Sequence, residues 1–265
     1  MRTRIGFIGT GVMGQAVIAT LLSAGVQPKQ ISFTRRKLEL VDEIRSKFGI
    51  ESKSLEDLVR SSDLIFLAMK PQDLIALLEQ IKEWLSPSTL IVSLAAGKST
   101  KVIQSTLGGP NPVIRVMPNT PMVVGEGVSA LSASESVAKE EVEWVRSLLA
   151  AGGLAIVVEE SLQDAVTAVS GSGPAYFFAF IEAMVKSGIE LGLSESEATK
   201  LSIATIKGAA VMLEESGKSA TTLRENVTSP NGTTAAALRE FKERGLDEMV
   251  VAAMKAARDR SLELG

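Results

Sequence analysis

The 265-residue chain carries 28 basic and 31 acidic side chains, for a net charge of −3, and it has neither histidine nor cysteine. These features exclude histidine acid–base catalysis, thiolate nucleophiles and most zinc sites, and they give no indication of nucleic acid as a partner. If the protein is an enzyme, a bound cofactor must supply the chemistry, and no metal is expected. Because no apolar run approaches about 18–20 residues and no signal segment or disulfide is evident, we expect a cytoplasmic protein without membrane contact.

Short aliphatic and β-branched runs alternate with helical patterns through residues 1–160. Strands are predicted at Arg4–Ile8, Gln30–Thr34, Leu64–Ala68, Leu90–Ser93, Val113–Val116, Val128–Leu131 and Ala155–Val158. The longer helices are predicted at Val12–Ala24, Lys37–Phe48, Pro71–Leu85 and Glu135–Leu149. Strands separated by helices indicate βαβ units in a largely parallel sheet, covered by helices on both faces. The sequence therefore predicts an α/β fold whose first domain, residues 1–160, is doubly wound and of Rossmann type.

From residue 161 the pattern changes to helices alone. They are predicted at Leu162–Ser170, Pro174–Leu191, Ser194–Glu215, near Thr221–Asn226, Thr233–Glu243 and Leu246–Leu264. Ser194 with Glu197 three residues later has the spacing of a capping box. Residues 161–265 are therefore expected to form an all-α domain.

The predicted helix Pro174–Leu191 is apolar around most of its circumference. Its large apolar side chains are Tyr176, Phe177, Phe178, Phe180, Ile181, Met184 and Val185. A helix that is apolar nearly all round must be buried, and about 100 helical residues offer little capacity to bury it within one chain. We therefore expect a homodimer that exchanges helices, with an ordinary monomeric core as the alternative.

A glycine-rich turn follows the first predicted strand and opens the first predicted helix. It comprises Ile8, Gly9, Thr10, Gly11, Val12, Met13 and Gly14. In this setting the glycines permit a tight turn, a close approach to a pyrophosphate and close packing of helix on strand. The agreement of strand, turn and helix favours dinucleotide binding over a purely structural turn.

The second predicted strand ends in Thr34, Arg35 and Arg36. NAD-specific sites usually place an acidic residue here to hold the ribose 2′-hydroxyl. Two guanidinium groups and a hydroxyl suit a 2′-phosphate instead. We expect NADP(H) in preference to NAD(H), although use of NAD(H) as well stays open; solvated surface arginines are the alternative interpretation.

Later strand ends are predicted to join the same crevice, because ligands of open α/β sheets bind at the carboxyl ends of the strands. Small residues there allow a flat nicotinamide to approach, and Asn119 could hydrogen-bond its carboxamide. The candidate residues are Ala68, Met69, Lys70, Pro71, Ala95, Gly97 and Asn119. Taken singly, each of these segments is more often a plain turn.

A second candidate site lies in the helical half. The segment Asn226–Thr234 places a glycine turn and several hydroxyls before a predicted helix, where free backbone amides and the helix dipole suit a carboxylate. An ordinary capped helix accounts for Thr233 or Thr234 but not for the whole hydroxyl cluster. Another glycine-rich turn, Ser170–Tyr176, opens the long apolar helix.

These motifs closely resemble those of the pyrroline-5-carboxylate reductases. The resemblance runs in register over essentially the full length. It is carried by Gly9–Gly14, Ala68–Pro71, Ser93–Gly97, Arg115–Pro121, Val124–Gly127, Ser170–Tyr176 and Val227–Lys242. The last block is the specific one, whereas the first alone would be weak.

The resemblance implies reduction of 1-pyrroline-5-carboxylate to L-proline, the final step of proline biosynthesis, with NAD(P)H as hydride donor. It also implies an interlocked helical dimer, often assembled into larger rings. The implied substrate-binding residues are Ser229, Pro230, Asn231, Gly232, Thr233 and Thr234. Among them, Thr234 occupies the position of the hydroxyl proposed to lie near the ring nitrogen, and it is the candidate catalytic residue.

Three positions depart from the family pattern. Val12 stands where many members have Asn, and the turn glycines remain. Asn231 replaces a common Gly, but asparagine tolerates the left-handed conformation better than most residues. Ser54 and Leu55 stand where many members have an Asn on the adenosine side, so that contact is in doubt.

Two rivals to the reductase remain. One is a reductase of a different cyclic imine, and the other is a non-catalytic NADP-binding regulator. A dehydrogenase is disfavoured, because related β-hydroxyacid dehydrogenases carry a lysine soon after a similar glycine turn. Here the stretch Ala175–Val185 has none before Lys186.

Overall fold

The computed structural model describes residues 3–36 and 38–264. It divides into two compact units: the residues up to Pro174 together with those from Ala257 onward, and the segment Ala175–Ala256. These units are defined by compactness, so the functional boundary predicted between residues 160 and 161 stays a prediction.

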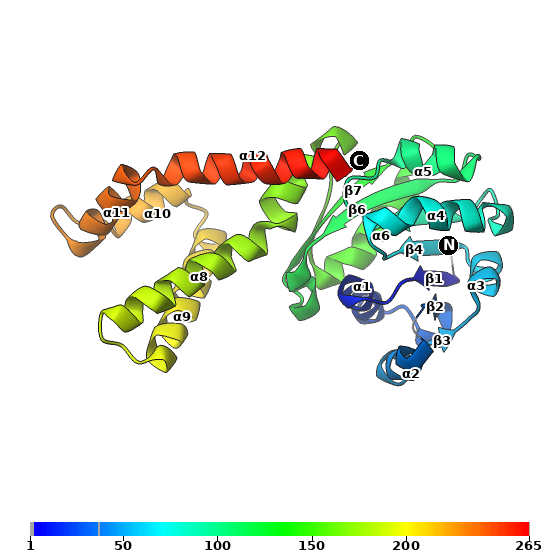
Figure 1. Ribbon diagram of the computed structural model, residues 1–265, viewed down its shortest axis with the longest axis horizontal. Helices are drawn as coiled ribbons and strands as arrows, with labels where there is room; N and C mark the ends of the chain where they lie inside the picture. The colour runs from blue at the N-terminus through cyan, green and yellow to red at the C-terminus, as the bar shows by residue number, and fades with distance from the viewer. Residues whose placement is uncertain (1–2, 37, 265) are drawn as a thin grey trace. The chain divides into compact units, whose positions relative to one another are not determined.

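The first unit is built on an eight-stranded sheet in the order β3-β2-β1-β4-β5-β6-β7-β8 (Figure 1). The strands are β1 Ile5–Ile8, β2 Ile31–Thr34, β3 Glu51–Ser52, β4 Leu64–Leu67, β5 Leu90–Ser93, β6 Val113–Pro118, β7 Gly127–Ala133 and β8 Gly153–Val157. Neighbouring strands run parallel, except that β6 and β7 are antiparallel. The order from β3 to β6 is that of the doubly wound dinucleotide-binding fold, and it reverses direction between β1 and β4.

Helices cover both faces of this sheet, as the sequence predicts. They are α1 Val12–Ser23, α2 Val41–Phe48, α3 Leu55–Ser61, α4 Pro71–Ile81, α5 Thr100–Leu107, α6 Lys139–Leu149 and α7 Gln163–Val166. The structure adds β3, α3 and α5, which the sequence pattern missed because two to eight residues show too little periodicity. Lys37, the predicted start of the second helix, lies outside the described residues, and α2 itself begins at Val41.

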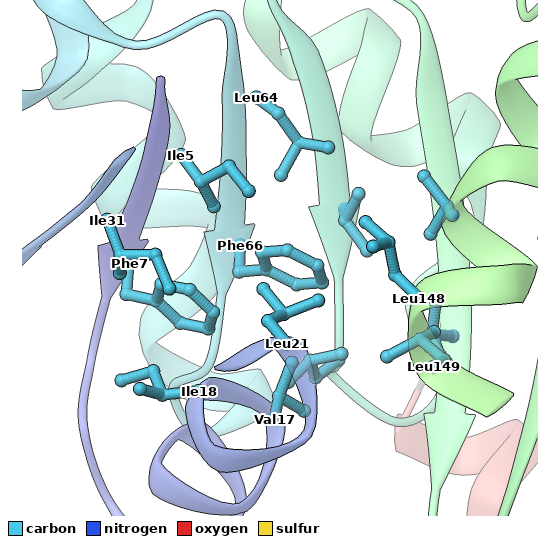
Figure 2. Close-up of a cluster of buried hydrophobic side chains, with 14 of the residues drawn as sticks. Ile5, Phe7, Val17, Ile18, Leu21, Ile31, Leu64, Phe66, Leu148 and Leu149 are labelled. Atoms are coloured by element: carbon cyan, nitrogen blue, oxygen red, sulfur yellow. The ribbon is translucent and has the colours of Figure 1, made fainter. Parts of the chain in front are cut away.

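Alternating side chains of the central strands feed two separate hydrophobic cores. On β4, Leu64 and Phe66 join the core beneath α1, α2 and α6, whereas Ile65 and Leu67 join the core beneath α3, α4 and α5. Phe66 stacks on Phe7 of β1 with the ring centroids 4.7 Å apart; Figure 2 shows this pair above Val17, Ile18 and Leu21 of α1. Strands buried on both faces are continuous apolar runs in the sequence, and their positions could therefore be predicted well from it.

The second unit consists of helices. The helices of the C-terminal half are α8 Gly173–Glu190, α9 Glu195–Glu215, α10 Ala220–Asn226, α11 Thr233–Glu243 and α12 Leu246–Leu264. The predicted capping box at the start of α9 is confirmed: Ser194 Oγ accepts the Glu197 N–H at 3.3 Å, and the Glu197 carboxylate accepts the Ser194 N–H at 2.9 Å. Helices α8 and α9 approach closely, since a Cβ on Gly188 of α8 would lie 3.0 Å from Ala198 Cβ of α9.

Large apolar side chains of this unit remain exposed. Among the described residues of Ala175–Ala256, the buried ones are Ala198 and Ser202, whereas Phe177 and Phe178 are 59% and 60% exposed. Contrary to the sequence expectation that no apolar run approaches membrane-spanning length, the helical stretch Glu160–Glu190 is long and apolar enough to cross a membrane by length and composition alone. One such stretch is weak evidence for a membrane span, because a helix buried inside a protein assembly meets the same criteria.

Candidate functional site

Three strand ends meet at the carboxyl edge of the sheet. The Gly9 N–H donates to Thr34 O at 3.1 Å, and the Ala68 N–H donates to Ile8 O at 2.9 Å. These bonds tie the end of β1 to the ends of β2 and β4, its two neighbours. The glycine turn, the arginine pair and the Ala68–Lys70 segment are therefore held at one edge, as expected for the ligand crevice of this fold.

Each glycine of the turn has a different steric role. Gly9 has φ +94°, and a Cβ there would lie 2.6 Å from Ala68 O. A Cβ on Gly14 would lie 2.6 Å from Gly9 O, so this glycine allows α1 to pack against the turn. Gly11 has open space where a Cβ would point, and it caps α1 without a side-chain hydrogen bond. The amides at the start of α1 are thus accessible to an anion, and the described first turn holds no acidic side chain.

A cleft of about 610 Å³ opens at this edge. Its lining comprises Ile8, Gly9, Thr10, Gly11, Thr34, Arg35, Arg36, Leu55, Ala68, Met69, Lys70, Asp73, Leu77 and Gln80. Thr10 is 2% exposed, and its hydroxyl has no hydrogen-bond partner among the described residues. A buried hydroxyl without a partner at the start of α1 fits a ligand oxygen, so the residues present suit a dinucleotide phosphate.

The arginine pair lies on the wall formed by the end of β2. Arg35 Nη1 donates to Leu40 O at 3.5 Å, while its buried Nε has no hydrogen-bond partner in the described part of the chain. The Arg36 guanidinium is 80% exposed and lies 3.7 Å from the Asp73 carboxylate. Both cations are thus available to an anionic group in the cleft.

Ten of the residues predicted to bind the cofactor line this cleft, and seven do not. The seven outside the lining are Val12, Met13, Gly14, Pro71, Ala95, Gly97 and Asn119. Pro71 occupies the first turn of α4 and Ala95 is 2% exposed. Their direct contact with a cofactor stays a prediction.

Asn119 has a structural role that the sequence did not reveal. Its Oδ1 accepts the Val128 N–H at 2.8 Å, and its Nδ2 donates to Ser170 O at 3.1 Å. Contact with a carboxamide is therefore left to its second amide hydrogen and to the second lone pair of Oδ1. The bond to Ser170 also ties the end of β6 to the π-helical turn Thr167–Gly171, a rare element that is frequent at functional sites.

Leu55, at the position that the sequence analysis placed on the adenosine side, lines the cleft. Three lining residues were missed by the sequence analysis: Asp73, Leu77 and Gln80. All three lie on α4, which begins at Pro71, shortly after β4 ends at Leu67. A helix that starts at the carboxyl end of a strand places its first turn beside the ligand crevice, and this rule could have identified Asp73.

The predicted substrate loop is a turn followed by a helix. The Gly232 N–H donates to Ser229 O at 3.1 Å, with Pro230 second in the turn and Asn231 third. Asn231 has φ 61°, the left-handed conformation expected of it, and no other non-glycine residue among those described has positive φ. Proline followed by a residue of positive φ is typical of a type II turn.

Helix α11 begins immediately after this turn, with Gly232 as a cap that offers no side-chain hydrogen bond. The first helical i to i−4 bond runs from the Ala236 N–H to Gly232 O, which leaves the amides of Thr233, Thr234 and Ala235 without an intrahelical partner. No acidic side chain lies in the described first turn. Amides and hydroxyls at a helix N-terminus can hold a carboxylate.

Two family models match the chain. Residues 160–264 match the model described as pyrroline-5-carboxylate reductase dimerisation. Residues 4–97 match the model described as NADP oxidoreductase, coenzyme F420-dependent. Together they cover the helical half and most of the sheet.

Curated relatives match over nearly the full length. The chain is 40% identical to pyrroline-5-carboxylate reductase of Corynebacterium melassecola, covering 99% of both sequences. It is 41% identical to the Pseudomonas aeruginosa enzyme of the same name, covering 98% of this chain and 96% of the relative.

Solved structures of similarly named proteins share the fold. A pyrroline-5-carboxylate reductase from Coxiella burnetii superposes with a TM-score of 0.91 at 36% identity, covering 99% of this chain and 98% of the other. The Plasmodium falciparum pyrroline carboxylate reductase with NADP bound gives a TM-score of 0.90 at 30% identity and the same coverage. The predicted fold class is thereby confirmed.

Proposed function

Because the chain belongs to the pyrroline-5-carboxylate reductase family, we propose that it reduces 1-pyrroline-5-carboxylate to L-proline, the final step of proline biosynthesis. The observation that supports this most strongly is the full-length identity of 40–41% to curated reductases. NADPH bound in the cleft would supply the hydride for the new C–H bond at the imine carbon, and the ring nitrogen would take up a proton. The chain itself must hold the ring, orient it and admit that proton.

This chemistry needs little from the side chains. A protonated cyclic imine accepts hydride readily, so positioning and one proton source suffice. Oxidation of an alcohol would instead require removal of the hydroxyl proton. A site without histidine is therefore compatible with imine reduction.

The cleft is proposed to hold NADP(H) in preference to NAD(H), with both accepted. Arg35 and Arg36 suit a 2′-phosphate, and each charge-assisted contact contributes about 1.5–3 kcal/mol. Replacement of both by alanine should lower the preference for NADPH over NADH by at least about tenfold. If the double variant keeps the preference of the parent protein, the arginines are not the 2′-phosphate site.

The turn Ser229–Gly232 and the start of α11 are proposed to hold the substrate carboxylate. Thr234, half-buried at the first turn of α11, would donate a proton to the ring nitrogen or hold the water that does. Thr234→Ala should lower kcat by roughly tenfold to a hundredfold while Kd for NADPH stays nearly unchanged. Thr234→Ser should restore most of the rate, and unchanged turnover in the alanine variant would mean that another group delivers the proton.

A homodimer is proposed for residues 161–265, with rings of dimers as a further expectation. The described part of the second unit exposes many large apolar side chains and buries few, which one chain in water would not sustain. A second copy, and not lipid, would cover the apolar stretch Glu160–Glu190, in keeping with a cytoplasmic protein. Light scattering on the detergent-free protein tests this, because a monodisperse monomer would contradict it.

The decisive assay is NADPH oxidation by the purified protein with 1-pyrroline-5-carboxylate, beside NADH and beside 1-pyrroline, which lacks the carboxylate. Rapid turnover with the carboxylated ring alone supports both the reaction and the role of the Ser229–Thr234 loop. Equal turnover of both rings would favour a reductase of a different cyclic imine. Tight NADPH binding without turnover would favour a non-catalytic regulator.

A further inference from the structure

A carboxylate lies among the groups that would surround the 2′ position of the cofactor ribose. Asp73 Oδ2 is 3.7 Å from Arg36 Nη1, and both residues line the cleft together with Thr34 and Arg35. Asp73 sits in the first turn of α4, whereas the acidic residue of NAD-specific sites follows the second strand. The cleft therefore combines the arginines that suit a phosphate with the carboxylate that suits a hydroxyl.

The ion pair between these two residues is weak. The Arg36 and Asp73 side chains are 80% and 46% exposed, and exposed pairs of this kind contribute little to stability. A bound dianionic phosphate can therefore draw Arg36 away from Asp73 at small cost. The Asp73 carboxylate would then face a like charge, which raises the free energy of the phosphate complex.

From this geometry we propose that Asp73 sets the balance between the two cofactors. It competes with a 2′-phosphate for Arg36, and it accepts a hydrogen bond from a free 2′-hydroxyl. This inference rests on the proposed use of NADP(H) in the cleft and explains why NAD(H) would also be accepted. Asp73 acts here as a specificity-determining residue that contacts the cofactor ribose.

A purely structural role for Asp73 makes a different prediction. A carboxylate in the first turn of a helix interacts favourably with the helix dipole and the free amides. If that were its whole role, Asp73→Asn would lower the thermal midpoint and leave the ratio of cofactor affinities unchanged. Equilibrium binding distinguishes the two roles without any measurement of turnover.

The test is titration calorimetry with NADP⁺ and with NAD⁺ on the parent protein and on Asp73→Asn. The variant keeps the size of the side chain and removes its charge. We expect NADP⁺ to bind about threefold to tenfold more tightly and NAD⁺ about twofold to threefold more weakly. An unchanged ratio of the two dissociation constants would overturn the proposal.

Two further variants separate this inference from the proposed function. Glu79→Gln removes one charge from the same helix, outside the cleft lining, where Glu79 pairs with Lys82 at 2.6 Å; its affinity ratio should match the parent. The Arg35→Ala plus Arg36→Ala variant should lose the preference for NADP⁺. If that loss occurs and Asp73→Asn has no effect, the Asp73 inference alone fails. If neither Asp73→Asn nor the double arginine variant alters the ratio of the two dissociation constants, the assignment of the 2′-phosphate site fails together with the Asp73 inference.

Discussion

Ser261 on α12 donates a 2.6 Å hydrogen bond to Asp164 Oδ1 on α7, 97 residues earlier in the chain. Asp164 Oδ1 also lies 3.5 Å from Arg115 Nη2, and Arg115 Nη1 lies 3.9 Å from Glu160 Oε1. Ser261 and Arg115 are 2% and 4% exposed. The last turn of α12 is thereby attached to the sheet domain through a partly buried cluster of charges.

Loss of this attachment should be measurable. Ser261→Ala removes one donor from a mostly buried carboxylate and should lower the free energy of unfolding of the first unit by about 1–2 kcal/mol. Urea unfolding measures the difference. Ser147→Ala, which removes an exposed hydroxyl bonded to Trp144 O in the last turn of α6, should change it by less than about 0.5 kcal/mol. Equal effects of the two substitutions would mean that the Asp164 bond contributes nothing.

Asp63 should make part of the stability dependent on pH. The hydrogen bond from the Arg4 guanidinium is the main cause that lowers the pKa of Asp63 to about 2 from an ordinary value of 3.8. Because the pKa is lower in the folded state, the stabilisation is fully present above about pH 4–5 and is lost as pH falls toward 2. With allowance for solvent screening it amounts to about 1–2 kcal/mol.

The measurement compares parent protein and Asp63→Asn in urea at several pH values. The difference in unfolding free energy should be largest at neutral pH and should shrink between about pH 4 and pH 2. A difference that stays constant down to pH 2 would contradict the ion-pair explanation.

Two glycines of the glycine-rich turn Gly9–Gly14 should differ in the effect of their replacement by alanine. Gly11 has φ −71° and open space at its Cβ position, so Gly11→Ala should fold with nearly unchanged stability. Its methyl group would nevertheless occupy the approach of the pyrophosphate and weaken NADPH binding by about tenfold or more. Gly9→Ala should instead destabilise the fold by about 1–3 kcal/mol, because its φ of +94° and the nearby Ala68 carbonyl leave no room. Fluorescence titration and thermal melts on both variants test this contrast.

Asn231 should be replaceable by glycine but not by a β-branched residue. Its φ of 61° costs little for asparagine and nothing for glycine, whereas valine there is strained. Asn231→Gly should therefore retain KM for 1-pyrroline-5-carboxylate, and Asn231→Val should raise it by about tenfold or more. Comparable KM values for the two variants would show that the turn geometry does not position the substrate.

The bounds of most helices and strands could be predicted from the local sequence pattern. The bounds of α11 and α12 agree with the predicted bounds, and the buried strands were placed within a few residues. The short helix α5, Thr100–Leu107, was missed because its eight residues complete about two turns. The antiparallel pairing of β7 with β6 also depends on contacts between strands that a local pattern does not contain.

The sequence by itself determined the glycine turn, the arginine pair and the hydroxyl-rich loop, because each is a run of adjacent residues whose chemistry is local. Only the tertiary structure decided that Asp73 reaches Arg36, 37 positions earlier in the numbering, and that the Asn119 amide is bonded to Ser170 and Val128. The physical reason is that pairing between distant segments follows from strand order and packing, which bring together residues whose side chains carry no mark of their partners.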